Sequence, residues 1–453
     1  MNERKESDLG KGSIGKLLFN LALPAITAQI INVLYNVVDR IYIGHIPVIG
    51  VEALTGVGVT FPLIMIISAF AALIGMGGAP RSAIMMGKGD DKTAEKILGN
   101  SFSALTIIAV ILTVFFLIFN EKLLLLFGAS KNTLPYAKDY MDIYTLGTLF
   151  VQIALGLNMF ITTQGFAKTS MLTVIIGAII NIILDPIFIF LLDMGVKGAA
   201  LATIISQAAS AIWVINFLTG NKTILKIKKE HLKIKAHIIF PIMALGVSPF
   251  IMQATESLLM VSFNFSLLKY GGDLAVGAMT ISSSVMQFTF MPIMRLTQGA
   301  QPIISFNYGA QNGERVKKTF CLLLCSSMIY TALVWLFIML IPTLFASLFT
   351  SNTELTAITA WALRIYMGAS FLLGAQVACQ QTFIALGKAK VSLFLALLRK
   401  VILLIPLIFI LPTFFENKVF AIFLAEPIAD IIAVAVTVIL FAAQFKKILN
   451  EMK

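Results

Sequence analysis

Two aspartates lie within long apolar stretches of the sequence, where little water is available to solvate a charge. Asp185 is preceded by Asn181 and followed by Pro186, and Asp39 lies in the first apolar stretch. An ionised carboxylate inside a membrane is costly, so each aspartate predicts a functional site. Asn181 and Asp185 are one helical turn apart and share a helix face. Pro186 lacks an N–H group, which frees a backbone carbonyl one turn earlier as a further polar ligand.

These residue types predict a site for a coupling ion. Two carboxylates in a pocket of low dielectric constant repel each other, and a proton shared with one of them relieves the repulsion. Alternatively, the carboxylates together with amide and hydroxyl oxygens supply the ligands that a hard cation such as Na+ requires. Both H+ and Na+ remain candidates, and we expect no other cofactor or metal.

The composition predicts an all-α polytopic membrane protein. The chain of 453 residues is 58% hydrophobic and 12% charged, whereas soluble domains carry about 25% charged residues. The apolar stretches lack the alternation of strands and are long enough for membrane helices. We expect twelve spans, at residues 16–43, 54–80, 97–119, 139–162, 171–192, 199–218, 238–266, 274–303, 319–343, 357–384, 392–413 and 419–443.

Lysine and arginine residues predict the orientation of these spans. If both termini are placed in the cytoplasm, most of these residues fall in the segments on the cytoplasmic side. This assignment counts Arg399 and Lys400 as cytoplasmic. The positive-inside rule therefore predicts a multi-pass protein of the cell membrane with both ends in the cytoplasm. The net charge of +12 reflects this topology rather than nucleic-acid binding. The lysine-rich connector at 222–235 is interpreted as a solvated linker or a contact with anionic lipids.

The two halves of the chain repeat at one constant offset. The matched pairs are Gly77 and Gly299, Pro80 and Pro302, Gly87 and Gly309, Lys96 and Lys318, and Ala167-Lys168 and Ala389-Lys390. Each half holds six spans, so the repeats are parallel and related by an axis along the membrane normal. We expect an N-terminal bundle at 1–220, a cytoplasmic linker at 221–237 and a C-terminal bundle at 238–453, with the bundles facing each other across a central cavity.

Several motifs in this order resemble the multidrug and toxic compound extrusion (MATE) family, most closely its DinF-like and MepA-like branch. They are Leu23-Pro24-Ala25, Val38-Asp39-Arg40, Asn181-Ile182-Ile183-Leu184-Asp185-Pro186, Gly195-Val196-Lys197-Gly198, Gly299-Ala300-Gln301-Pro302 and Asn307-Tyr308-Gly309-Ala310. The resemblance implies an ion-coupling cluster of Asp39, Asn181, Asp185, Thr203 and the carbonyl of Ala199, with Tyr140 and Asn158 nearby. It also implies that Pro24 bends the first helix.

Other polar residues within the spans are candidates for a substrate cavity. Glu256 is similar to a seventh-span glutamate of the NorM-like branch, but the span at 357–384 lacks the acidic partner used there. Glu256 is therefore interpreted either as a ligand for a cationic substrate or as the partner of Arg295 or Arg364. Further cavity candidates are Tyr35, Asn36, Gln287 and Arg295.

The resemblance implies a secondary active antiporter. It would export lipophilic, often cationic drugs and dyes in exchange for H+ or Na+. A flippase or exporter of a lipid-linked or other endogenous metabolite is an alternative, although the small number of basic residues in the spans argues against a groove for pyrophosphate. A passive channel or an intramembrane enzyme is a further alternative, but the sequence contains no phosphate-binding Gly-rich motif or catalytic histidine pair. We expect membrane lipids and small molecules as partners, and no obligate protein partner.

Overall fold

A computed structural model describes residues 9–350 and 352–452, and this part of the chain is built from helices without strands. The uniformly apolar stretches become helices because a membrane-spanning segment must satisfy its own backbone hydrogen bonds. The expected all-α fold is thereby confirmed.

The first bundle precedes the lysine-rich connector. Its elements are α1 (Ile14–Gly44), α2 (Gly50–Gly87), α3 (Asp91–Leu126), α4 (Leu134–Leu146), α5 (Thr148–Thr163), α6 (Ala167–Pro186), the π-helical segment η2 (Ile187–Leu191) and α7 (Gly195–Thr219). The connector contains the short 3-10 helix η3 (Lys229–His231).

The second bundle follows the connector. Its elements are α8 (Ala236–Gly309), α9 (Gly313–Leu340), α10 (Pro342–Ser347), α11 (Thr353–Tyr366), the 3-10 helix η4 (Ser370–Leu372), α12 (Leu373–Ala385), α13 (Ala389–Leu397), the π-helical segment η5 (Leu398–Leu404), α14 (Ile405–Ile410), η6 (Leu411–Thr413) and α15 (Lys418–Glu451).

The twelve expected spans are present, but two of them are broken. In the described residues, nine helices are long and apolar enough to cross a membrane, and two bent pairs bring the number to eleven. The pairs are α4 with α5, bent by 60°, and α11 with η4 and α12, bent by 48°. The twelfth span of this count comes from α8, which contains two spans. The chain turns sharply between them at Gly272, whose φ of 65° and ψ of −164° are not helical.

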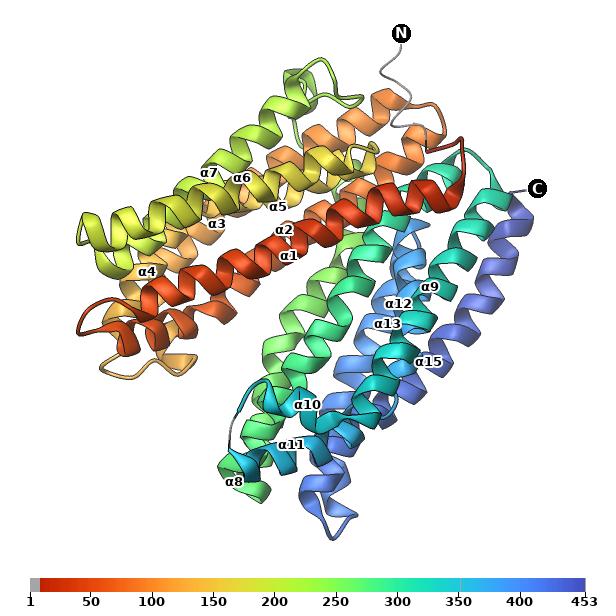
Figure 1. Ribbon diagram of the computed structural model, residues 1–453. Helices are drawn as coiled ribbons and strands as arrows, with labels where there is room; N and C mark the ends of the chain where they lie inside the picture. Colours follow the sequence, from red (N-terminus) through yellow and green to blue (C-terminus); the bar gives the residue numbers. More distant parts are fainter. Residues whose placement is uncertain (1–8, 351, 453) are drawn as a thin grey trace.

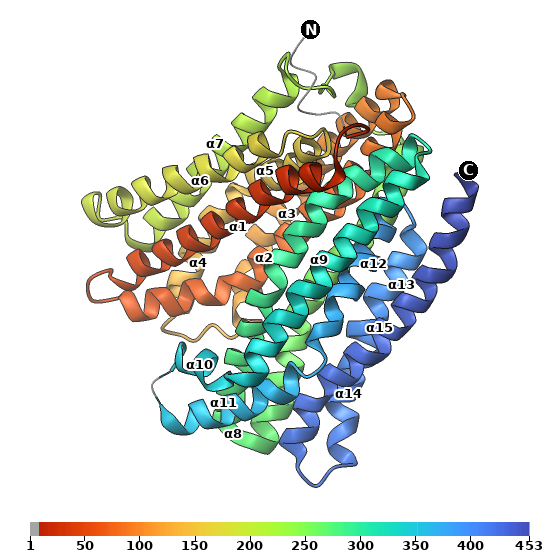
Figure 2. The ribbon, with the colours of Figure 1, turned by 45° about the vertical axis from the view of Figure 1, so that its right-hand side comes forward.

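The two bundles lie close together at the end that holds both termini, and they diverge toward the opposite end (Figures 1 and 2). In both views α1–α7 form one layered group, and α8–α15 form the other. The far end of the first group carries α4 and the α1–α2 turn, and the far end of the second carries α10 and α11.

The bundles meet through close backbone contacts between α2 and α8. A Cβ atom added at Gly87 would overlap the carbonyl oxygen of Phe306, and one added at Gly309 would overlap that of Ile84. These two contacts are exchanged by the repeat, which pairs Gly87 with Gly309 and Ile84 with Phe306. Reciprocal contacts of this kind are the signature of a two-fold axis. The glycines therefore allow the two helices to cross at the axis of pseudo-symmetry.

The lysine-rich connector is docked on the first bundle rather than free in solvent. The Oε1 atom of Gln164, at the end of α5, accepts hydrogen bonds of 2.8 Å from the backbone N–H groups of Ile224 and Leu225. Glu95, near the start of α3, accepts from Lys228 Nζ at 2.5 Å, and this hydrogen bond raises the pKa of Lys228. The connector's backbone is therefore fixed, although most of its lysine side chains remain exposed.

Candidate functional site

The fold brings the two aspartates predicted from the sequence together. Asp39 lies in the last third of α1 and Asp185 near the end of α6, and these two helices pack along each other. The carboxyl groups are within hydrogen-bonding reach of each other. Both side chains are buried, with exposed fractions of 8% and 0% for the two residues. If both acidic groups are ionised in this position, they repel each other strongly unless a positive charge compensates them.

Asn181 and Pro186 shape the α6 side of the pair. Asn181 Nδ2 donates a hydrogen bond of 3.2 Å to Asp185 Oδ1, as expected for residues one turn apart. Pro186 supplies no N–H group to the carbonyl one turn earlier, and the helix continues as the π-helical segment η2. Such segments are rare and are found often at functional sites.

Three buried oxygen atoms of this cluster have no hydrogen-bonding partner among the described residues. They are Asp39 Oδ1, Asn181 Oδ1 and Asp185 Oδ2. Buried acceptors in folded proteins are almost always paired, so unpaired oxygens on three contacting side chains need an explanation. A proton or a cation such as Na+ fits this arrangement, because either satisfies acceptor oxygens and lowers the local negative charge.

Residues from α4 and α7 border the pair. Thr203 Oγ1 donates to the carbonyl oxygen of Ala199 at 3.0 Å, so its lone pairs remain available as ligands. The Tyr140 hydroxyl lies within hydrogen-bonding reach of Thr203, and its ring stacks on Tyr144 at a centroid distance of 6.1 Å. Tyr35, one turn before Asp39, also lies in the electrostatic field of both carboxyl groups.

Asp39 does not form an ion pair with Arg40, within the part of the chain that the structure describes. The Arg40 guanidinium instead lies 5.7 Å from the centre of the Phe61 ring. The neighbouring arginine therefore does not neutralise the Asp39 carboxyl group by direct pairing in this arrangement.

Other predicted residues lie away from the acidic pair. Asn158 joins α5 to α6 by donating to the Ser170 carbonyl at 3.1 Å and accepting from Thr173 Oγ1 at 3.0 Å. Thr173 is about 18 Å along α6 from Asp185. Asn36 is exposed and bonds within α1 to Asn32.

The remaining cavity candidates lie in the first helix and in the second span of α8. Pro24 is buried inside α1, and Gln287 is exposed on α8. Arg295 donates to Gln29 of α1 and to Gln298 Oε1, the latter at 2.7 Å. Arg295 therefore joins the two bundles and does not pair with Glu256.

The expected partners of Glu256 were wrong, and so was the placement of two basic residues on the cytoplasmic side. Glu256 forms an ion pair with Lys400, and Arg399 forms ion pairs with Glu426 and Asp430.

Arg399 and Lys400 lie in η5, in the middle of the span formed by residues 389–413. The sequence already indicated that these two residues lie within the membrane, because both fall inside the apolar run at 392–413. A charged pair inside a span predicts buried partners rather than a loop.

The fold and the buried acidic pair define the class of this protein. It belongs with the polytopic membrane proteins built from two parallel repeats of six spans, here with a buried acidic pair in the first repeat.

The family model described as MatE matches residues 24–187 and again 249–410, so this chain belongs to the MatE family. The match falls once on each half, as the internal repeat requires. Membership in this family makes the chain a membrane transporter and not an enzyme.

Individual relatives agree with this assignment. The multidrug export protein MepA of Staphylococcus haemolyticus is 25% identical over 425 residues, which cover 93% of each chain. A crystal structure of MATE in the bent conformation has a TM-score of 0.92 at 23% identity and covers 99% of both chains. An outward-facing multidrug resistance MATE family transporter of the MOP superfamily has a TM-score of 0.88 at 23% identity and covers 98% of both chains. These structures share the two-bundle fold of this chain.

Proposed function

We propose that this protein is a multidrug efflux antiporter that exports lipophilic, often cationic compounds across the cell membrane in exchange for H+ or Na+. The observation that carries the proposal is the set of three unpaired buried oxygens on Asp39, Asn181 and Asp185. The names of the MepA and MATE relatives support the substrate class, and the buried acidic pair supports coupling to a monovalent cation.

The mechanism follows from the charge of the pair. When no ion is bound, the two carboxyl groups repel each other and disfavour close packing of α1 on α6. A proton or Na+ removes this repulsion and stabilises the close packing. Substrate binds between the bundles, so ion and substrate need not touch. They only need different affinities for the conformations that open to the two sides of the membrane.

The positive-inside rule supports an outward-open state for this structure. The end at which the bundles meet carries the exposed lysines of the connector and both termini, which this rule assigns to the cytoplasm. The bundles then diverge toward the outside. A lipid-linked pyrophosphate as substrate is not favoured, because both cations of η5 already have carboxylate partners.

Ethidium export from everted membrane vesicles tests the proposal, with a pH gradient and a Na+ gradient imposed in separate experiments. We expect one of the gradients to drive transport by the wild-type protein, which identifies the coupling ion. Asp185→Asn removes one charge and one titratable group, and we expect it to abolish gradient-driven transport while the amount of protein in the membrane is unchanged.

Asp193→Asn is the matched control, because Asp193 is exposed and lies just after η2, at the α6–α7 connection. It should transport like the wild type. Wild-type transport by Asp185→Asn would refute the assignment of the site. Export that neither gradient drives would refute antiport itself.

A further inference from the structure

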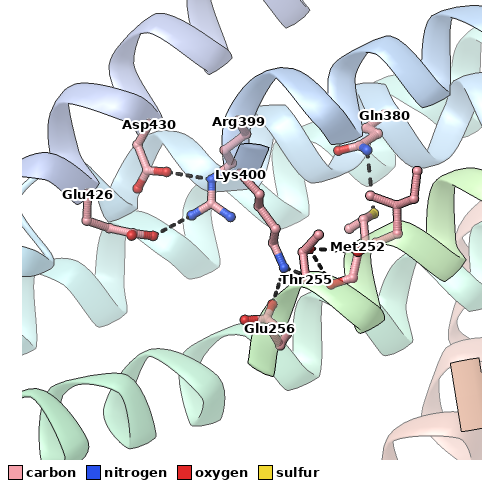
Figure 3. A network of polar contacts seen from close by, with 9 residues as sticks. Met252, Thr255, Glu256, Gln380, Arg399, Lys400, Glu426 and Asp430 are labelled. Carbon is pink, nitrogen blue, oxygen red and sulfur yellow. Dashed lines mark hydrogen bonds and ion pairs between the residues drawn. The ribbon is translucent and has the colours of Figure 1, made fainter. Parts of the chain in front are cut away.

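The π-helical segment η5 sends two neighbouring basic side chains to two different helices. Arg399 donates from Nε to Asp430 Oδ1 and from Nη2 to Glu426 Oε1 of α15, at 2.7 Å in both cases. Lys400 Nζ bonds to Glu256 on α8 and donates to the Met252 carbonyl at 2.9 Å. Figure 3 shows the Arg399 guanidinium turned toward the two acids of α15 and the Lys400 chain extended toward Glu256. Neither cation belongs to the acidic pair of the first bundle.

The Glu256–Lys400 pair is strongly asymmetric in its exposure. The Lys400 side chain is 7% exposed, whereas the Glu256 side chain is 65% exposed. A surface carboxylate is therefore neutralised by an ammonium group that reaches it from the interior of the bundle. A ligand arriving from outside the bundle meets the carboxylate first.

Helical spacing places Glu256 at the edge of the α8 face that contacts the other bundle. Ile242 contacts Gly77 of α2 through its backbone carbonyl. Glu256 follows Ile242 by fourteen residues, which is about four helical turns, so the two residues share a helix face. The carboxylate is thus on the side from which a substrate passing between the bundles would approach.

The network holds more acid than base. Among the described residues it contains three carboxyl groups and two cations, since Arg399 pairs with both Glu426 and Asp430 whereas Lys400 pairs with Glu256 alone. Glu426 Oε2 and Asp430 Oδ2 are buried and have no partner among the described residues. Glu426 also acts electrostatically on Lys400. If Lys400 leaves Glu256, its ammonium group stays near the two acids of α15, whose charges then match those of Arg399 and Lys400 together.

The two halves of the molecule treat corresponding helices differently. The repeat pairs Ala167-Lys168 with Ala389-Lys390, so the span that begins at α6 corresponds to the span that begins at α13. In the first bundle, α1 and α6 are joined by two carboxyl groups whose charge a proton or a cation would compensate. In the second bundle, the corresponding helices are joined by a carboxylate and the ammonium group of Lys400. The second bundle thus carries its cation as part of the chain.

We propose that Lys400 is a tethered counter-ion that occupies Glu256 until a cationic substrate displaces it. Lys400 is then a specificity-determining residue, since a compound must carry a positive charge to compete with it. This inference rests on the proposed export of organic cations and identifies the substrate class as monovalent lipophilic cations. The displaced ammonium remains inside the second bundle near the unpaired oxygens of the α15 acids.

Equilibrium binding of ethidium to purified protein in lipid nanodiscs, measured by fluorescence anisotropy without an ion gradient, tests this proposal. In Lys400→Met the competing ammonium is absent, and we expect ethidium to bind about tenfold more tightly than to the wild type. Lys400→Arg keeps the charge and should bind ethidium like the wild type. The gain should disappear when Glu256→Gln is combined with Lys400→Met, because the carboxylate is the shared partner.

Two outcomes would overturn the proposal. One is unchanged or weaker binding by Lys400→Met, including the absence of binding by both proteins. The other is a gain that persists in the double variant. Lys400→Gln serves as the second variant if the methionine protein has a lowered melting temperature. Failure of ion coupling is seen separately, in the gradient-driven vesicle experiment, since the anisotropy measurement involves no gradient.

Discussion

Arg315, in the first turn of α9, donates a hydrogen bond of 2.9 Å from Nη1 to the carbonyl oxygen of Gly12, which precedes α1. Its Nη2 atom also donates to the carbonyl oxygens of Leu9 and Lys11 at 3.3 Å, and Asn307 donates to Leu9 at 2.9 Å. Residues 9–12 therefore form a strap that joins the first bundle to the second at the end where the bundles meet. The buried Leu9 side chain adds an apolar contact with the second bundle.

Loss of Arg315 should release this strap. Arg315→Gln removes charge-assisted donors to three backbone carbonyls, and we expect local opening to become about tenfold more frequent. Tryptic cleavage after Lys11, followed by mass spectrometry in everted vesicles, measures this opening. Glu314→Gln is the control, because it removes only an exposed ion pair with Lys318. Equal cleavage rates for Arg315→Gln and the wild type would contradict this role.

Larger residues at the crossing of α2 and α8 should impair transport. In Gly87→Ala the new methyl group would overlap the Phe306 carbonyl, which cannot move without shifting α8. We expect the bundles to be forced apart at the end that holds the termini, and ethidium efflux from cells to fall by about tenfold or more. Gly309→Ala should have the same effect, because it makes the reciprocal contact.

Gly58→Ala is the control for this crossing. It lies in the same helix, and a Cβ atom there would have no neighbour within 4 Å. Alanine is the better helix former by about 1 kcal/mol, so this variant should be at least as stable as the wild type. Normal efflux by Gly87→Ala would show that the crossing tolerates a wider spacing.

The spans and the repeat were predictable from the sequence because both depend on local patterns. A membrane requires long apolar helices, and a duplicated chain keeps glycines and prolines at one offset. The breaks within the fourth and tenth spans were not predictable in this way. They occur at Gly147 and near Gly368, in stretches whose apolar character continues through the bend.

The candidate site was predictable in part. The bond between Asn181 and Asp185 follows from helical spacing alone. The approach of Asp39 to Asp185 depends on how α1 packs on α6. The residues lie far apart in the chain, so their shared rarity within apolar spans and the family resemblance indicated a common site, but no spacing rule did. Lys400 was missed because a positive charge was attributed to a loop. Its partner at Glu256 lies on another helix, and no spacing rule connects them.

The stability of the first turn of α3 should fall in acid, whereas that of the first turn of α9, its counterpart in the second repeat, should not. The Asp90 side chain caps α3 by accepting from the N–H group of Thr93, and Asn312 caps α9 by accepting from that of Arg315. Hydrogen bonding from the Thr93 side chain, and then from its N–H group, lowers the pKa of Asp90 below its ordinary value of 3.8. The capping contribution of Asp90 is therefore fully present above pH 3.8 and is lost as the pH falls through the lower folded value.

Hydrogen exchange near pH 3 should reveal this difference. After correction for intrinsic rates, the first turn of α3 should lose protection as the pH falls, and the first turn of α9 should not, since asparagine does not titrate in this range. Asp90→Asn should make the two helices behave alike. Equal loss of protection at both helices would indicate general acid unfolding instead.

The buried ion pairs of Arg399 make the last prediction. Removing Arg399 leaves Glu426 and Asp430 in the interior without a cation, and such a loss typically costs about 3–5 kcal/mol. We expect Arg399→Met to lower the melting temperature in detergent strongly. Neutralising both acids at the same time, with Glu426→Gln and Asp430→Asn, should restore most of the stability, because no buried charge then lacks its partner. Lys390→Met, at an exposed lysine in the first turn of α13, should leave the melting temperature unchanged. A triple variant no more stable than Arg399→Met would show that Arg399 stabilises the bundle through packing rather than through its charge.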